Sequence, residues 1–152
     1  MKRKIVCGID FGTTNSVVAL ITEAGDAEVV RVAGKDVVRP TVLYVDGDNV
    51  LIGEEAENAE ALDPDRFIRE PKRELGKTND DGTPIVLFAD PTTGKQWSVV
   101  DLTAEFLSQL KNFLESELDA EIVGGGLSHP AYFDDRARRQ LKMAAEQAGL
   151  PV

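Results

Sequence analysis

The residues best suited to chemistry lie in one short stretch, Gly8 to Ser16, which reads GIDFGTTNS. Asp10 ends an apolar run and is followed by a turn of small, hydroxyl-bearing residues. Successive backbone N–H groups in such a turn can surround an anion, threonine hydroxyls add donors, and Gly12 lets the backbone approach a ligand closely. The Asp10 carboxylate can hold a hydrated Mg²⁺, which prefers carboxylates and water. The pattern predicts a phosphate and magnesium site; an ordinary hairpin is the alternative interpretation.

The elements that must position this stretch begin with three apolar segments separated by short turns. They are predicted as strands over Lys4–Asp10, Ser16–Thr22 and Glu28–Val32. Strands in succession joined by short turns form an antiparallel meander. The phosphate-binding pattern is therefore expected at the first turn of a three-stranded meander.

A second group of elements is predicted between residues 40 and 100. It comprises a hairpin of Thr41–Val45 with Val50–Ile52, a helix over Gly53–Leu62, short helical pieces over Asp65–Gly76 broken at Pro71, and a second hairpin of Pro84–Ala89 with Gln96–Val100.

The C-terminal part is predicted to contain two helices separated by a strand. Apolar residues at three- and four-residue steps predict a helix from about Leu102 to Leu118, with Asp101 as its N-cap. The next segment, Ile122–Leu127, has the position of a strand although it holds three consecutive glycines, which weaken strands. The last helix is expected from Asp134 or Asp135, with Gly149 at its C′ position.

The composition favours one globular domain, or two small lobes, and excludes several function classes. The 152 residues include 17 basic and 27 acidic side chains, and the net charge of −10 argues against nucleic acid or a membrane surface as partner. The single cysteine, Cys7, permits no internal disulfide, and neither a signal peptide nor a membrane span is found. We therefore expect a cytoplasmic protein. The GKT at Gly76 to Thr78 is not a P-loop, because Pro71 stands where the first glycine belongs.

The stretch from Gly8 to Ser16 resembles the first phosphate-binding turn of the actin, sugar-kinase and heat-shock-chaperone ATPases. Further stretches narrow the resemblance to the DnaK-type 70-kDa heat-shock chaperones, in order and at suitable spacing. They are Val38–Val42, Glu70–Gly76 and Pro130–Asp135 with Arg138 and Ala148–Leu150 beyond. The fold that this resemblance implies is an α/β ribonuclease-H-like, actin-like ATPase first lobe, in which a three-stranded meander plus helices carries an inserted small α+β lobe. Its core lobe would comprise residues 1–36 and 119–152, and its small lobe residues 37–118.

The resemblance also implies roles for individual residues, with ATP or ADP and Mg²⁺ as cofactors. Asp10 would lie near the metal ion and its waters, and Gly12, Thr13, Thr14 and Asn15 would surround the β- and γ-phosphates. Lys72 matches the family's lysine near the γ-phosphate, although the local sequence alone favours a solvated surface lysine. Pro130 and Arg138 match a relay from the nucleotide to the peptide-binding domain.

The sequence departs from the family pattern in places. His129 stands where the family has a β-branched residue, and we assign it no role; Gly124–Gly126 replaces an apolar core strand, which is expected to lower stability. The resemblance also implies a second lobe and a peptide-binding domain beyond this stretch, so we expect the chain as given to be a first-lobe fragment that is inactive alone. The whole protein would hydrolyse ATP to bind and release unfolded polypeptides, together with co-chaperones. A sugar-kinase-like phosphotransferase and a non-catalytic chaperone-like interaction module remain alternatives.

Overall fold

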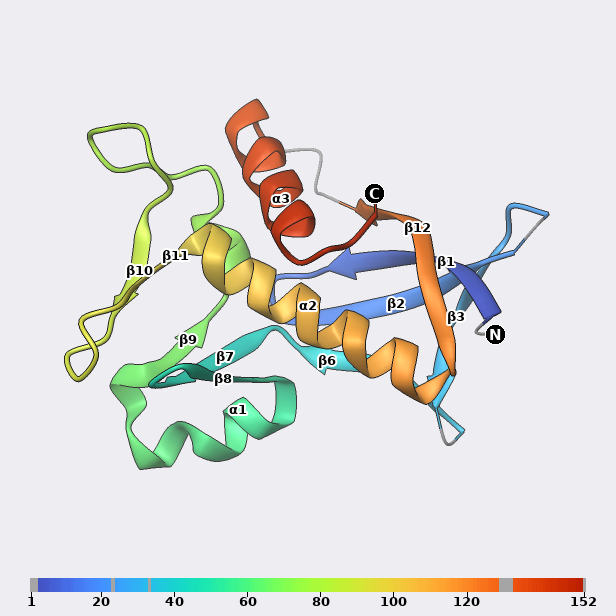
Figure 1. The fold of residues 1–152 in the computed structure, drawn as a ribbon, viewed down its shortest axis with the longest axis horizontal. Helices are drawn as coiled ribbons and strands as arrows, with labels where there is room; N and C mark the ends of the chain where they lie inside the picture. Colours follow the sequence, from blue (N-terminus) through green and yellow to red (C-terminus); the bar gives the residue numbers. More distant parts are fainter. Residues whose placement is uncertain (1–2, 23, 33, 129–132, 152) are drawn as a thin grey trace.

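The structure, a computed structural model, describes residues 3–22, 24–32, 34–128 and 133–151 and has a mixed α/β architecture. Its main sheet has the strand order β12-β1-β2-β3, and β6 also pairs with β2 (Figure 1). The strands are β1 (Arg3–Phe11), β2 (Asn15–Ile21), β3 (Ala27–Val29), β6 (Val38–Pro40) and β12 (Ala120–Ser128). β1, β2 and β3 are antiparallel neighbours, so the predicted meander is confirmed, whereas β12 runs parallel to β1.

One face of this sheet forms the core against the long helix α2 (Val99–Glu117). Alternate side chains of β1, including Ile5, Cys7, Ile9 and Phe11, are buried, as expected for a strand with one face covered. The ring of Phe11 meets Phe106 of α2 edge to face, with 5.7 Å between the ring centroids. The aromatic pair fixes the end of β1 that leads into the predicted phosphate turn.

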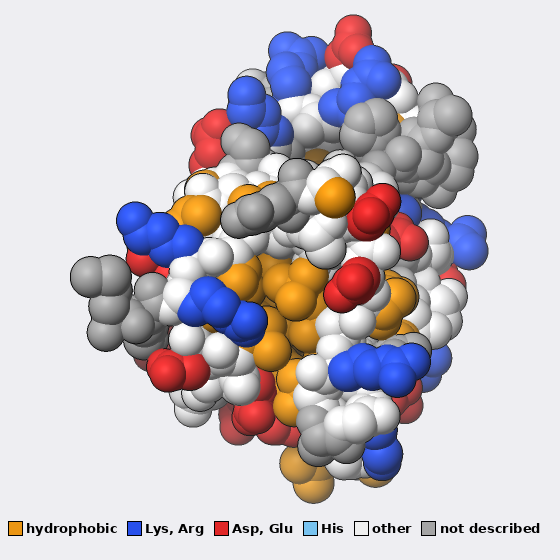
Figure 2. Space-filling view, turned by 90° about the vertical axis from the view of Figure 1, so that its right-hand side faces the viewer, with side chains coloured by type: hydrophobic (Ala, Val, Ile, Leu, Met, Phe, Trp, Pro, Cys, Tyr) orange, Lys and Arg blue, Asp and Glu red, His pale blue; other side chains and the backbone are white. Residues whose placement is uncertain are grey.

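The other face of the sheet leaves apolar side chains exposed. Val6 of β1, Ile21 of β2, Val29 of β3 and Val123 of β12 are all more than a third exposed. Figure 2 shows hydrophobic side chains gathered in a hollow on the side of the molecule where these strands lie.

The predicted third strand, Glu28–Val32, is divided at Val30. β3 ends at Val29, and β4 (Arg31–Val32) pairs instead with β5 (Lys35–Asp36) in a small separate ribbon. Val30 itself is buried and its N–H donates to the carbonyl of Val18 at 2.9 Å. The chain is therefore hydrogen-bonded to β2 as far as Val30 and pairs with β5 from Arg31 onwards. Strand propensity alone cannot reveal this change of pairing partner.

The segment with three glycines does form a strand, and its pairing explains one of the glycines. The register of β12 along β1 shifts between Ile5 and Val6, which leaves Val123 as the extra residue of a bulge. A Cβ added to Gly125 would lie 2.1 Å from the carbonyl oxygen of Cys7, whereas one added to Gly126 would meet nothing within 4 Å. Close backbone approach thus requires glycine at position 125.

A second sheet lies beside the main one, in the order β8-β7-β9, and its neighbours are one short helix, single helical turns and a hairpin (Figure 1). The elements are β7 (Val42–Asp46), β8 (Asn49–Ile52), α1 (Gly53–Ala59), η1 (Glu60–Leu62), η2 (Pro64–Arg66), β9 (Phe67–Arg69), η3 (Pro71–Glu74), β10 (Val86–Ala89) and β11 (Gln96–Ser98). Both predicted hairpins are confirmed. The helical interpretation of residues 65–76 is wrong for β9, which is a strand paired with β7. It could not be recognised from the sequence because three residues are too few to show the two-residue period of a strand.

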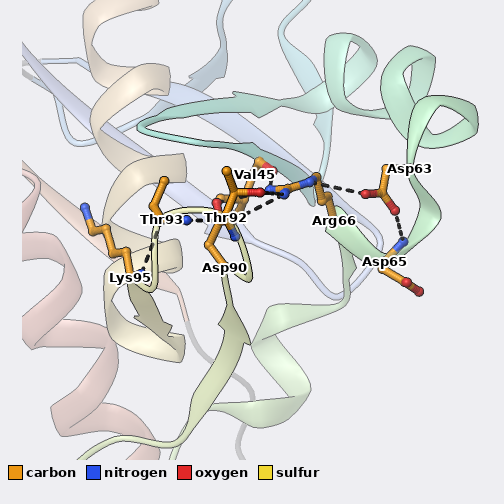
Figure 3. A network of polar contacts seen from close by, with 8 residues as sticks. All are labelled: Val45, Asp63, Asp65, Arg66, Asp90, Thr92, Thr93 and Lys95. Carbon is orange, nitrogen blue, oxygen red and sulfur yellow. Dashed lines mark hydrogen bonds and ion pairs between the residues drawn. The ribbon is translucent and has the colours of Figure 1, made fainter.

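A buried ion pair joins this sheet to the β10–β11 turn (Figure 3). The guanidinium of Arg66 donates to both carboxylate oxygens of Asp90, at 3.1 and 3.3 Å, and to the carbonyl of Val45 at 3.1 Å. Asp90, which is 1% exposed, also accepts from the backbone N–H groups of Thr92 and Thr93. These hydrogen bonds hold the pKa of Asp90 below its ordinary value.

The two longer helices start and end at identifiable caps. α2 begins after Ser98, whose hydroxyl accepts from the Asp101 N–H while the Asp101 carboxylate accepts from the Ser98 N–H. The predicted N-cap, Asp101, is therefore wrong; it is the third helical residue of a capping box. α3 (Asp135–Gln147) follows its N-cap Asp134, and Gly149 has the positive φ (77°) predicted for its C′ position. α2 packs against both α3 and β12.

No helix in the described ranges is long and apolar enough to span a membrane.

Candidate functional site

The C-terminal end of β1 carries Asp10 between two neighbouring strands. Asp10 is opposite Val17 of β2 and opposite Ser128 of β12. The hydroxyl of Ser128 donates to Oδ1 of Asp10 at 2.8 Å, and the carboxylate remains exposed. Ser128 was missed by the sequence analysis, because only the β1–β12 register brings it there. Among the described residues, Ser128 is the hydrogen-bond donor to Asp10, and within this part of the chain the other carboxylate oxygen is open to a ligand.

The turn after Asp10 is closed tightly by Gly12. A Cβ at this position would lie 2.1 Å from the carbonyl oxygen of Asn15, so no other residue can occupy it without moving the turn. We predicted that Gly12 allows a ligand to approach; in the structure the close approach is to the turn's own backbone. Thr13 is partly exposed, and Thr14 and Asn15 are exposed.

The far side of the turn is anchored to the start of the second sheet. The N–H of Thr41 donates to the carbonyl of Thr14 at 2.8 Å, and the fully buried hydroxyls of Ser16 and Thr41 share a hydrogen bond of 2.8 Å. Asn15 pairs with Pro40 of β6. The turn is therefore held from both sides, which preorganises its N–H and hydroxyl donors.

Lys72 lies in the short turn η3 and is 7% exposed, which excludes a solvated surface lysine. Its Nζ lies 5.7 Å from the centroid of the Phe133 ring. Burial lowers the pKa of the Lys72 ammonium below its ordinary value, and the negative charge of Asp10 partly offsets this effect. A lysine that is held in this way can neutralise an anion at the site.

A cleft of about 630 Å³ contains Thr13 and Lys72 together, between η3 and the start of α3. Phe133, Asp134 and Ala137 line its other wall. Thr14 and Asn15 line a separate, smaller pocket of about 230 Å³, which Thr13 also borders. The structure thus brings Thr13 and Lys72 to one cleft, where the negative charge of Asp10 acts to raise the pKa of Lys72. Thr14 and Asn15 line the pocket on the other side of the turn.

The two residues predicted to form a relay do not line this cleft in the structure: Arg138 is absent from its lining, and Pro130 lies outside the described residues. Arg138 is exposed on α3 and forms an ion pair with Asp135. Pro130 and His129 lie outside the described residues. Phe133 was not singled out by the sequence analysis; its place beside Lys72 depends on the packing of segments about 60 residues apart in the chain.

The donor set fits phosphate groups and a hydrated metal ion. The described residues contain no cluster of three or more His, Cys, Asp or Glu that could enclose a metal directly. One carboxylate, that of Asp10, is suited to Mg²⁺ that retains most of its water. A buried lysine and a turn of N–H and hydroxyl groups are suited to the phosphates.

The chain is similar over nearly its whole length to curated chaperones. It is 35% identical over 164 residues to a Chaperone protein HscA homolog of Pseudoalteromonas atlantica, and 35% identical over 161 residues to that of Bordetella pertussis. It is 36% identical over 152 residues to the Chaperone protein DnaK of Thermotoga maritima. Each comparison covers 99% of this chain but only 24–26% of the relative, so the chain spans about a quarter of their length. The model of the family described as Hsp70 protein matches residues 6–152, and the chain therefore belongs to the Hsp70 family, which implies the actin-like ATPase fold.

Proposed function

We propose that this chain is the phosphate-binding first lobe of a chaperone ATPase, and that the whole protein hydrolyses ATP to drive the binding and release of unfolded polypeptides. The observation that carries the proposal is the burial of Lys72 in the cleft that also contains Thr13. Burying a cation is unfavourable unless an anion compensates it. A phosphate group in this cleft would supply that anion and restore the pKa that burial lowers.

The proposed roles follow from the chemistry of each group. The N–H and hydroxyl donors of the turn at Gly12, Thr13, Thr14 and Asn15 bind the β- and γ-phosphates of ATP or ADP. Lys72 neutralises negative charge that develops on the transferred phosphoryl group. Asp10, steadied by Ser128, accepts hydrogen bonds from water bound to Mg²⁺. Mg²⁺, when bound, supplies further neutralisation of phosphate charge.

The proposal includes the division of the chain and its partners. We propose residues 1–36 and 119–152 as the core lobe and residues 37–118 as the inserted small lobe, with β6 and α2 of the latter packed on the core lobe through β2, β12 and α3. Pro130 and Arg138 form the relay toward a peptide-binding domain, which with a second nucleotide-binding lobe belongs to the whole protein. Co-chaperones and unfolded polypeptides in the cytoplasm are its partners. The chain by itself would bind nucleotide weakly and would not turn it over, because the closed cleft that excludes water needs both lobes.

The names of the relatives favour this function over the sugar-kinase alternative. HscA homolog and DnaK are both named as chaperone proteins. If the chain binds no phosphate compound, the alternative of a non-catalytic interaction module is favoured.

The test is a calorimetric titration of the chain with Mg-ATP, Mg-tripolyphosphate and adenosine. We expect both phosphate compounds to bind and adenosine not to bind, because the described donors suit phosphate. Lys72→Ala and Asp10→Ala should each weaken binding of Mg-ATP about tenfold or more, the loss of one charge-assisted interaction.

Lys142→Ala is the matched control, because Lys142 is an exposed lysine on α3 and does not line the cleft. Equal weakening in Lys142→Ala would show that net charge, not the cleft, governs affinity. Binding of adenosine with no binding of tripolyphosphate would contradict the phosphate site.

A further inference from the structure

Gln140 of α3 is a buried amide with both polar atoms committed to one neighbouring segment. It is 5% exposed, on the same buried helix face as Ala137, Leu141 and Ala144. Its Oε1 accepts from the N–H of Gly76 at 2.8 Å, and its Nε2 donates to the carbonyl of Lys77 at 3.2 Å. A buried side-chain amide that binds two consecutive backbone groups holds that backbone in one place.

The clamped backbone also lies directly against α3. Gly76 has a φ of 95°, and a Cβ there would be 3.1 Å from the N–H nitrogen of Ala137 and 3.3 Å from its Cα. The close approach and the positive φ therefore favour glycine at position 76. Gln140 and Gly76 together set the distance between α3 and the segment that precedes Gly76.

The segment that precedes Gly76 carries Lys72. The turn between them is tight: the Leu75 N–H donates to the carbonyl of Lys72 at 3.3 Å, and the Lys77 N–H donates to that of Glu74 at 3.2 Å. A constraint at residues 76 and 77 is therefore transmitted over one short turn to residue 72. At the other end, the ammonium of Lys72 faces Phe133, which directly precedes the N-cap of α3.

We propose that Gln140 is a positioning residue: its carboxamide fixes Gly76 and Lys77 against α3, and thereby holds Lys72 in the cleft beside Thr13. This inference rests on the proposed function for its consequence in nucleotide binding, but the structural part stands by itself. Gln140 does not line the cleft and does not touch the ligand; it acts through the backbone.

The test compares Gln140→Met, which keeps the side-chain length and removes both hydrogen bonds, with Gln147→Met. Gln147 lies on the same helix and donates to Asp101 of α2 at 3.1 Å, so its loss affects the helix but not the Lys72 segment. The first readout is acetylation of Lys72 by an amine-reactive ester, followed by peptide mass spectrometry. We expect Lys72 to react about tenfold faster in Gln140→Met, because losing two buried hydrogen bonds favours local opening, and to react unchanged in Gln147→Met.

The second readout is affinity for Mg-ATP, which should fall about tenfold in Gln140→Met but not in Gln147→Met. Unchanged Lys72 labelling in a folded Gln140→Met would overturn the inference, as would equal acceleration in both variants. If Lys72→Ala binds Mg-ATP as the wild type does, the proposed function fails; faster labelling in Gln140→Met would still support the clamp. Should Gln140→Met not fold, Gln140→Glu tests one half of the clamp, because it retains the acceptor for the Gly76 N–H and removes the donor to the Lys77 carbonyl. Unchanged Lys72 labelling in Gln140→Glu would then overturn the inference.

Discussion

Alanine substitution at the three consecutive glycines of β12 should give three different results, although their sequence context is nearly the same. At Gly125 the new Cβ would lie 2.1 Å from the Cys7 carbonyl oxygen. Carbon and oxygen approach normally to about 3.3 Å, so β1 and β12 must separate by roughly 1 Å. Overpacking of this size costs about 1–3 kcal/mol, and each weakened ladder hydrogen bond adds about 1 kcal/mol. We expect Gly125→Ala to lower the free energy of unfolding by about 3 kcal/mol.

The neighbouring glycines are internal controls. Gly126→Ala meets nothing within 4 Å, and Gly124→Ala makes only an ordinary contact of 3.7 Å with Cγ2 of Val6. Neither glycine has a positive φ, so alanine fits the folded backbone without strain. Because alanine also lowers the conformational entropy of the unfolded chain, each substitution should raise the free energy of unfolding by about 0.4–1 kcal/mol. The three variants therefore separate the effect of losing a glycine from the effect of adding a methyl group at one position.

The assay is equilibrium urea denaturation of the wild type and the three variants, with calorimetry beside it. A loss of about 3 kcal/mol in a chain of this size lowers the Tm by roughly 6–12 °C. Stabilities of Gly125→Ala and Gly126→Ala that agree within about 0.5 kcal/mol would refute the close approach of β12 to β1. That result would favour the view that the glycines merely weaken the strand.

Three further predictions concern a helix cap, an ion pair and a thiol. Ser98→Ala removes half of the capping box of α2 and should cost about 1 kcal/mol in urea denaturation; no change would show that the cap is dispensable. Hydrogen bonds from Arg66 hold the pKa of Asp90 below its ordinary value, so the ion pair stabilises fully above the ordinary value and loses this stabilisation as the pH falls through the folded-state pKa. Asp90→Asn should therefore make the free energy of unfolding depend less on pH between about pH 5 and pH 2, and an unchanged dependence would contradict this. Burial, aided by the charge of Glu115, raises the pKa of the Cys7 thiol. Cys7 in the native protein should therefore react with thiol reagents about a hundredfold more slowly than Cys7 in the protein unfolded by urea, and equal rates would contradict its burial.

Local sequence signals located most elements and the turn that follows Asp10. Apolar runs and turn residues predicted β1, β2 and both hairpins, and three- and four-residue spacing predicted α2 and α3. The N-cap of α2 was harder to predict from sequence, because Ser98 and Asp101 are both residue types that cap helices. Only the observed start of the helix at Val99 identifies Ser98 as the cap. The short β9 escaped because its three residues carry no period and are stabilised by pairing with β7.

The sequence alone determined the chemistry available at the site. Asp10, Gly12 and the hydroxyl residues that follow are neighbours in the chain, so their types and order are enough to predict a turn with anion-binding donors. The match to a known family strengthened the interpretation of Lys72, whose immediate neighbours indicate only a charged surface.

Only the tertiary structure decided which distant residues complete the site. Ser128 reaches Asp10 across 118 positions, and Gln140 reaches Gly76 across 64. Such contacts depend on strand register and on helix packing, which are set by the burial of the whole core and not by any local signal. The same packing buries Lys72, which its neighbours in the sequence would place on the surface. A buried ammonium group needs a compensating anion, whereas an exposed one is solvated by water.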